Sequence, residues 1–149
     1  MRYASFGSVS SGTMRTEDLL EAFASELDYQ LSRQPRRFAR RAYRKLINEA
    51  RARRRRSARA SYVVEKLMEA LEDFAPPYAY FGAHPGDGAD YGYWLTDDLE
   101  GAFDGLRVDD TSEVPRDYRG EVLHINDHGN ATLAVAGARG KLREVWALV

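Results

Sequence analysis

The stretch Tyr78–Trp94, YAYFGAHPGDGADYGYW, decides the fold because it places two aromatic-rich segments on either side of the tetrapeptide PGDG. Aromatic and small residues alternate in both segments, and glycine and aspartate occupy the centre, as in two strands joined by a tight turn. The sequence before this stretch has the periodicity of helices, and most of the sequence after it has the two-residue periodicity of strands. The pattern predicts a β-hairpin between a helical part, residues 1–76, and a mainly β part, residues 77–149.

Three helices are predicted before the hairpin. Apolar residues recur at helical spacing over 17–32, 36–55 and 58–74. Pro35 separates the first two helices, and Pro76–Pro77 ends the third because proline cannot continue a helix. The arrangement predicts two to three consecutive helices of the αα-hairpin type that each bury one face.

The sequence after the hairpin has the clearest strand pattern of the chain. Alternating residues and the turns DHGN and GARGK predict an antiparallel meander. Residues 2–8 are consistent with either a short strand or a tucked arm. The elements expected after the hairpin are a short capped helix within 96–103, a possible strand at Leu106–Val108, and strands at Glu121–Asn126, Ala131–Ala136 and Leu142–Val149.

These elements predict an α+β fold in one domain, residues 1–149, with two to three helices on one face of an antiparallel sheet of four to five strands. A chain of 149 residues can bury a stable core without disulfides or a structural metal. It has no cysteine, so neither disulfides nor zinc–thiolate sites can form. No segment approaches the ~20 apolar residues of a membrane helix, and the N-terminus lacks the apolar run of a signal peptide. We therefore expect a soluble intracellular protein with no membrane partner and no cofactor.

The net charge of −1 conceals a strong asymmetry along the chain. Residues 33–59 hold twelve Arg and one Lys against one Glu, whereas residues 69–149 hold sixteen acids against six cations. The two segments therefore carry net charges of +12 and −10. Such a dipolar chain indicates either an anionic partner for the basic segment or self-association, and a homo-oligomer is expected.

The arginine-rich segment is the first candidate binding surface. Guanidinium groups bind phosphates bidentately, and Tyr43 and Tyr62 are candidates for base stacking. The alternatives are neutralisation by acids of the β part or of a second subunit, and binding to an acidic protein. The cations assigned to a nucleic-acid or partner surface are Arg36, Arg37, Arg40, Arg41, Arg44, Arg51, Arg54 and Arg55.

The aromatic stretch is the second candidate surface. One half of the alternating positions in a strand faces the core, and we expect Phe81 and Trp94 to lie there. The other half suits partner recognition because exposed tyrosines present a large and rigid contact area. The tyrosines assigned to this surface are Tyr78, Tyr80, Tyr91 and Tyr93.

All three histidines lie at or near the turns PGDGAD and NDHGN, together with aspartates. If both turns lay at one end of a sheet, these groups could converge on a metal, or a His–Asp pair could perform acid–base chemistry. The alternative is structural, because Asp and Gly are the residues that tight turns require. No HExxH, EF-hand or nucleophile-elbow motif is present, so a binding protein is favoured over an enzyme. The residues assigned to the possible site are His84, Asp87, Asp90, His124, Asp127 and His128.

The segments YFGAHPGDGADYGYW, INDHGNATL and REVWALV, with the first twenty residues, resemble a group of small phage- and prophage-encoded proteins without an established activity. The resemblance implies a mobile-element origin, and with it a location in the cytoplasm of a bacterial host or in a virion. Pro85 and the arginine-rich middle depart from the group's pattern, so a function built on residues 33–59 would be particular to this protein.

The combined expectation is a non-enzymatic accessory protein of a phage or mobile element that acts by macromolecular binding. Nucleic acid, bound through the arginine-rich helix, is the first candidate partner. The second is a protein of a host defence complex, which a counter-defence inhibitor would bind through a charged and aromatic surface. The third is a small metal- or His/Asp-dependent enzyme.

Overall fold

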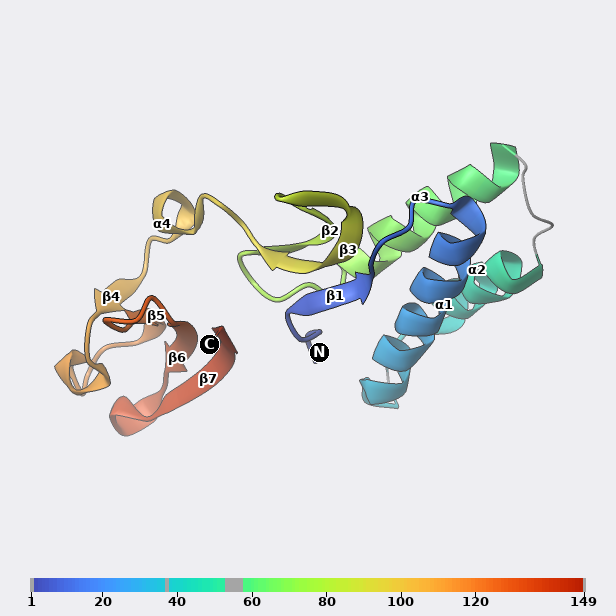
Figure 1. Ribbon diagram of the computed structural model, residues 1–149. Helices are drawn as coiled ribbons and strands as arrows, with labels where there is room; N and C mark the ends of the chain where they lie inside the picture. The colour runs from blue at the N-terminus through green and yellow to red at the C-terminus, as the bar shows by residue number, and fades with distance from the viewer. Residues whose placement is uncertain (1, 37, 53–57, 149) are drawn as a thin grey trace. The chain divides into compact units, whose positions relative to one another are not determined.

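The computed structural model in Figure 1 describes residues 2–36, 38–52 and 58–148. These residues form two compact units, Met1–Thr96 and Asp97–Val149, which we call unit 1 and unit 2. Each unit contains one sheet and its own cluster of buried apolar side chains. Among the described residues, no helix combines the length and the hydropathy that a membrane-spanning segment requires.

Unit 1 contains the three predicted helices, which are α1 (Thr16–Arg33), α2 (Arg41–Ala52) and α3 (Ala58–Glu72). The helix predicted over 36–55 begins later than expected, at Arg41. The preceding residues form a turn in which the Phe38 amide donates to the Pro35 carbonyl at 2.9 Å. The Phe38 ring packs on Tyr43 and Phe74, and this tertiary contact favours the turn over another turn of helix.

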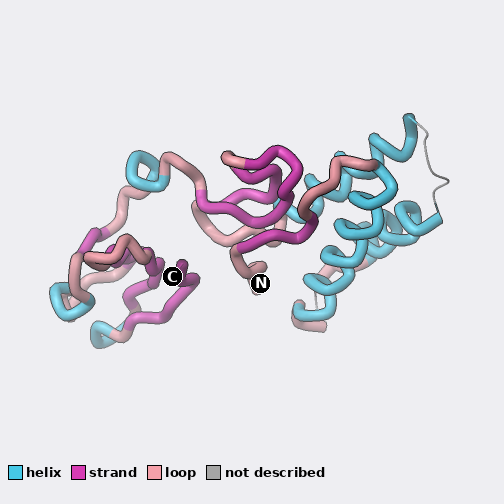
Figure 2. The backbone as a smooth tube through the Cα atoms, viewed as in Figure 1, coloured by secondary structure: helices cyan, strands magenta, loops and turns pink. Residues whose placement is uncertain are grey.

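The aromatic hairpin is confirmed, and it belongs to unit 1 with the helices (Figure 2). Strands β2 (Ala79–His84) and β3 (Asp87–Leu95) pair antiparallel. Strand β1 (Gly7–Ser10) pairs with the other edge of β3, so the sheet has the order β1-β3-β2. The strand or arm considered for residues 2–8 is therefore a strand only at its end, because β1 begins at Gly7 and continues to Ser10 along the free edge of β3.

The core of unit 1 is formed by the three helices and one face of the hairpin. The Phe23 side chain is fully buried, and its ring meets the Phe81 and Tyr91 rings edge-on at centroid distances of 5.1 and 5.5 Å. These contacts explain why the hairpin packs with the helices. The other large side chains that are almost completely buried in this core include Leu27, Leu31, Leu67, Leu71, Phe74 and Tyr93.

Gly92 allows β1 and β3 to approach closely. A Cβ at this position would lie 2.2 Å from the Gly7 carbonyl oxygen and 2.9 Å from the Ser8 Cα, which are backbone atoms. We expect Gly92→Ala to lower the free energy of unfolding by about 1–3 kcal/mol, the usual cost of overpacking. Gly88→Ala is the matched control because a Cβ at that position of β3 has no atom within 4 Å. Urea denaturation of both variants measures the difference, and equal stabilities would contradict the close approach.

Unit 2 holds the predicted meander in a second sheet, whose strands lie in the order β4 (Leu106–Val108), β5 (Gly120–Ile125), β6 (Ala131–Ala136) and β7 (Leu142–Leu148). Buried Val108, Val122 and Ala136 form an apolar cluster on the sheet. The other elements of unit 2 are α4 (Leu99–Ala102), a 3₁₀ turn at Thr111–Glu113 and a 3₁₀ turn at Ala138–Gly140.

The α+β class is confirmed, but the prediction of one antiparallel sheet of four to five strands is wrong in two respects. The hairpin and the C-terminal strands form separate sheets, and β4 runs parallel to β5. Parallel pairing needs a connection of about a dozen residues, and residues 109–119 supply one of nearly that length. The three strands β5, β6 and β7 pair antiparallel as predicted.

Candidate nucleic-acid interface

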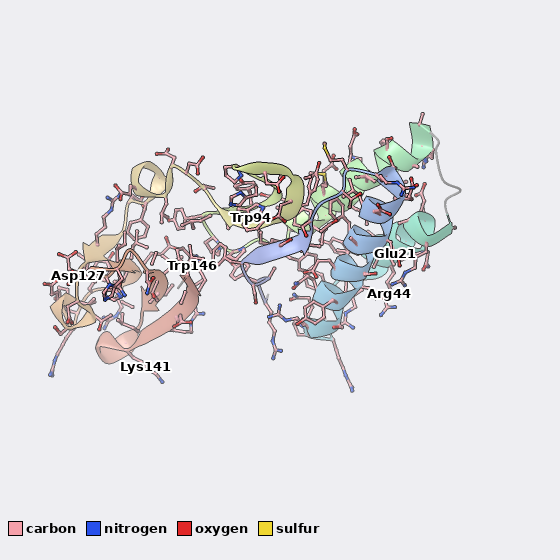
Figure 3. The ribbon with its side chains drawn as sticks, viewed as in Figure 1. Glu21, Arg44, Trp94, Asp127, Lys141 and Trp146 are labelled. Carbon is pink, nitrogen blue, oxygen red and sulfur yellow. The ribbon has the colours of Figure 1, made fainter. Side chains whose placement is uncertain are left out.

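Helix α2 separates its apolar and cationic side chains onto opposite faces. Ile47 and Ala50 are buried, and Tyr43 and Leu46 are half-buried against the core of unit 1. The exposed cations recur at spacings of three, four and seven residues, so they share one side of the helix. We call this surface the α2 basic face, and it consists of Arg41, Arg44 (labelled in Figure 3), Lys45 and Arg51.

The cations of the α2 basic face are mostly unneutralised. Arg51 Nη2 lies 2.9 Å from Asp28 Oδ2 of α1, and both side chains are about half exposed, so this pair is weak. Arg41, Arg44 and Lys45 form no ion pair with any residue in the described ranges. Three positive charges on this face therefore remain available to an anionic partner.

The remaining predicted arginines divide into three groups. Arg36 is exposed but lies before α2. Arg40 is half-buried, and its Nη2 donates to the carbonyl oxygens of Gln34, at 2.5 Å, and Pro35, at 3.4 Å. Arg40 is therefore a structural residue that caps backbone carbonyls, which sequence composition could not distinguish from a phosphate ligand. The predictions for Arg37, Arg54 and Arg55 lie outside the described residues.

Tyr43 is not available for base stacking, contrary to the prediction. Its hydroxyl donates to Asp73 Oδ2 at 2.8 Å, and its ring stacks on Phe38 at 5.8 Å between centroids. Partial burial, followed by the hydrogen bond to Asp73 and its charge, raises the pKa of Tyr43 to about 12. The hydrogen bond from Tyr43 to Asp73 links α2 to the end of α3.

The Tyr62 ring on α3 is exposed and lies beside two cations, as base stacking next to phosphates requires. Its side chain is 45% exposed, and the Arg59 guanidinium and the Lys66 ammonium lie 5.0 and 5.7 Å from its ring centre. Arg59 also binds Glu49 of α2 at 2.9 Å, which ties the two helices together. Lys45, Arg59 and Lys66 were not among the residues assigned from the sequence, although helical spacing places Arg59 and Lys66 three and four residues from Tyr62.

The aromatic surface predicted on the hairpin is wrong for Tyr93. Tyr93 pairs with Phe81 in register, and both rings face the helices with centroids 4.9 Å apart. Tyr93 is 1% exposed, and its burial, together with the charges of nearby carboxylates, raises the pKa of its phenol. Tyr91 lies two residues before Tyr93 on β3, so both side chains are on the same face of the sheet. Tyr91 is half-buried, and its ring packs on Phe23.

The opposite face of the hairpin holds the aromatics that are less buried. Tyr80 pairs with Trp94 in register, and both side chains are half-buried, as is Tyr78. Trp94 (Figure 3) donates from Nε1 to the Gly82 carbonyl at 3.0 Å and meets the His84 ring edge-on. The prediction that Trp94 lies in the core with Phe81 is therefore wrong, because the two residues lie on opposite faces of the sheet.

The three assigned residues near the first turn stabilise the hairpin itself. His84 Nδ1 accepts from the Gly86 amide at 3.0 Å, and Asp87 Oδ1 accepts from the Ala89 amide at 2.9 Å. Asp90 Oδ1 accepts from the Ser8 hydroxyl at 2.5 Å, which joins β3 to β1. These contacts favour the structural interpretation of PGDGAD.

The three assigned residues near the second turn belong to unit 2. His124 Nε2 lies 3.0 Å from the Asp109 carbonyl oxygen, and the His128 amide donates to Asn126 Oδ1 at 3.0 Å. Asp127 is exposed in the turn between β5 and β6 (Figure 3). Across residues 2–36, 38–52 and 58–148, no three His, Asp or Glu side chains gather as a metal site would require. The six residues divide between the two units, three in each, and the contacts given for each set lie within its own unit.

Comparison with protein-family models, with curated proteins and with solved structures finds no match to this chain. Its function must therefore be inferred from its own residues, of which the α2 basic face is the most distinctive group.

Proposed function

We propose that the protein binds nucleic acid through the α2 basic face, as a non-enzymatic accessory protein of a phage or other mobile element. One observation carries this proposal, namely that Arg41, Arg44 and Lys45 share an exposed face without an ion pair to another described residue. Exposed cations at helical spacing are suited to the phosphate backbone, whose charge dominates nucleic-acid affinity.

The distribution of charge supports this proposal despite the overall net charge of −1. Unit 1 holds sixteen Arg and Lys against twelve Asp and Glu, a net charge of +4, whereas unit 2 has a net charge of −5. At physiological ionic strength, charges interact over a Debye length of roughly 8 Å. The attraction for a polyanion therefore depends on local clusters such as the α2 basic face, and the total charge matters less.

The exposed ring of Tyr62 favours single-stranded over double-stranded partners. Unpaired bases can stack on an aromatic side chain, which duplex bases cannot do without unstacking. Arg59 and Lys66 beside the ring add charge for the neighbouring phosphates. A partner with accessible bases would use both the ring and the cations.

The experiment that tests this function is a titration of fluorescently labelled single-stranded DNA, RNA and duplex DNA with the purified chain at several salt concentrations. If three to four phosphates are contacted, a plot of the logarithm of the association constant against the logarithm of the salt concentration should have a slope of about −2 to −3 for single strands. We expect the single strands to bind more tightly than the duplex. No binding at low salt, or an affinity independent of salt, would contradict the proposal.

A further inference from the structure

A second basic feature of unit 1 lies at the C-terminal end of α1. A hollow of about 350 Å³ opens there, lined by Arg2, Arg33, Gln34, Pro35 and Arg36. Three of these five residues are arginines, and none is acidic. The hollow shares no residue with the α2 basic face.

The fold holds the hollow together through Gln34, which is 4% exposed. Gln34 Nε2 donates to the Arg2 carbonyl at 2.7 Å, and the Arg2 amide donates to Gln34 Oε1 at 2.9 Å. This reciprocal pair brings Arg2 from the N-terminal arm to the end of α1. The Arg40 guanidinium donates to the carbonyl oxygens of Gln34 and Pro35, which also stabilises the turn after α1. The hollow therefore lies where two segments distant in the chain are held together by hydrogen bonds.

The arginines of the hollow lack a carboxylate partner. Arg33 Nη1 donates to the neutral Gln30 side chain at 3.3 Å, and its guanidinium lies 5.6 Å from the Tyr29 ring centre. Arg2, Arg33 and Arg36 form no ion pair with another described residue. The nearby Glu26 is engaged by Gln30 Nε2 at 2.6 Å. Three positive charges thus line one hollow without neutralisation.

We propose that this hollow binds the dianion of a phosphate monoester. Guanidinium groups form bidentate, charge-assisted hydrogen bonds with phosphate oxygens, and a monoester offers three terminal oxygens and nearly two charges at pH 7. A phosphodiester offers only one charge, so it matches three arginines that line one hollow less well. The monoester is either the terminal phosphate of a nucleic acid or a small phosphorylated molecule.

Inorganic phosphate is the probe for the site itself. We expect saturable changes in the ¹H–¹⁵N spectrum, confined to residues 31–36 and to Arg2, at constant ionic strength. The dianion of a phosphate monoester forms with a pKa near 6, so a simple monoester such as phenyl phosphate should bind about fourfold more tightly at pH 7.5 than at pH 5.5. Identical changes with sodium chloride alone would overturn the proposal.

Substitutions assign the binding to the arginines. The double variant Arg33→Gln with Arg36→Gln should weaken phosphate binding at least tenfold, whereas Arg143→Gln, an exposed arginine on β7, should leave it unchanged. If Arg33→Gln perturbs amides throughout unit 1, the single variant Arg36→Gln replaces the double variant, because Arg36 is exposed. We expect Arg36→Gln to weaken phosphate binding several-fold. Unchanged affinity in these variants would overturn the proposal.

Two oligonucleotides distinguish the sources of the monoester. Tighter binding of a 5′-phosphorylated strand than of its 5′-hydroxyl counterpart, lost in the double variant, assigns the site to nucleic-acid ends. Equal binding of the two strands, with phosphate binding retained, assigns it to a small phosphate monoester. Substitution of the α2 basic face should weaken both strands alike and leave inorganic phosphate unaffected, so failure of the proposed function is distinguishable from failure of this site.

Discussion

Replacing Arg41, Arg44 and Lys45 together with glutamine is expected to weaken single-stranded nucleic-acid binding on the order of 10²-fold or more at 50 mM salt. Each phosphate contact releases condensed counterions, so losing three contacts should also reduce the salt slope by about 2. Glutamine has nearly the helix propensity of Arg and Lys, and the three side chains are exposed. Thermal stability should therefore change little, and fluorescence anisotropy with a melting curve measures both results.

The matched control removes the same three charges from unit 2, where Arg116, Lys141 and Arg143 are exposed. The control variant should bind almost as tightly as the wild type. Equal losses in both variants would show that overall charge, and not the α2 basic face, governs binding. A lowered melting temperature in the α2 variant alone would instead indicate that acids of this protein or of a second copy neutralise the face.

Truncating Phe23 to alanine is expected to lower the free energy of unfolding by about 3–5 kcal/mol, the range for a large aromatic removed from a core. Its ring is fully buried between α1 and the hairpin and meets Phe81 and Tyr91 edge-on. Both the transfer of apolar surface and the cavity contribute to the loss. Urea denaturation followed by far-UV circular dichroism measures it, because the long helices all lie in unit 1.

Tyr29→Ala provides the control for Phe23 on the same helix. Its side chain is 56% exposed and contacts only the Arg33 guanidinium among the ring and cation contacts described for it. We expect a loss below about 1 kcal/mol, the scale of an exposed cation–π contact. A similar loss in the two variants would show that the hairpin does not pack on α1.

Local patterns in the sequence were sufficient to identify most elements. Helical periodicity located α1 and α3, Pro76–Pro77 marked the end of the helical part, and PGDG marked the turn of the hairpin. These signals are reliable because each arises from backbone geometry within a few residues. The same reasoning identified the meander of β5, β6 and β7.

The buried face of the hairpin was decided by tertiary structure. The alternation of side chains along β3 correctly placed Tyr91 and Tyr93 on one face of the strand. It did not determine whether that face packs on the core or lies in solvent. Phe23 of α1 determines the answer, because its ring lies against Phe81 and Tyr91. Tyr93 is therefore core, and Trp94 lies on the other face.

The sequence by itself determined where positive charge is concentrated, and only the tertiary structure decided which of these charges are available. Arg40 caps carbonyls at the end of α1, and Arg51 pairs with Asp28, whereas Arg41 and Arg44 remain exposed. Tertiary structure also decided that the strands form two sheets and that Arg2 and Arg33 line the same hollow. Strand edges, hydrogen-bond acceptors and counter-charges come from residues distant in the chain, so no local pattern encodes them.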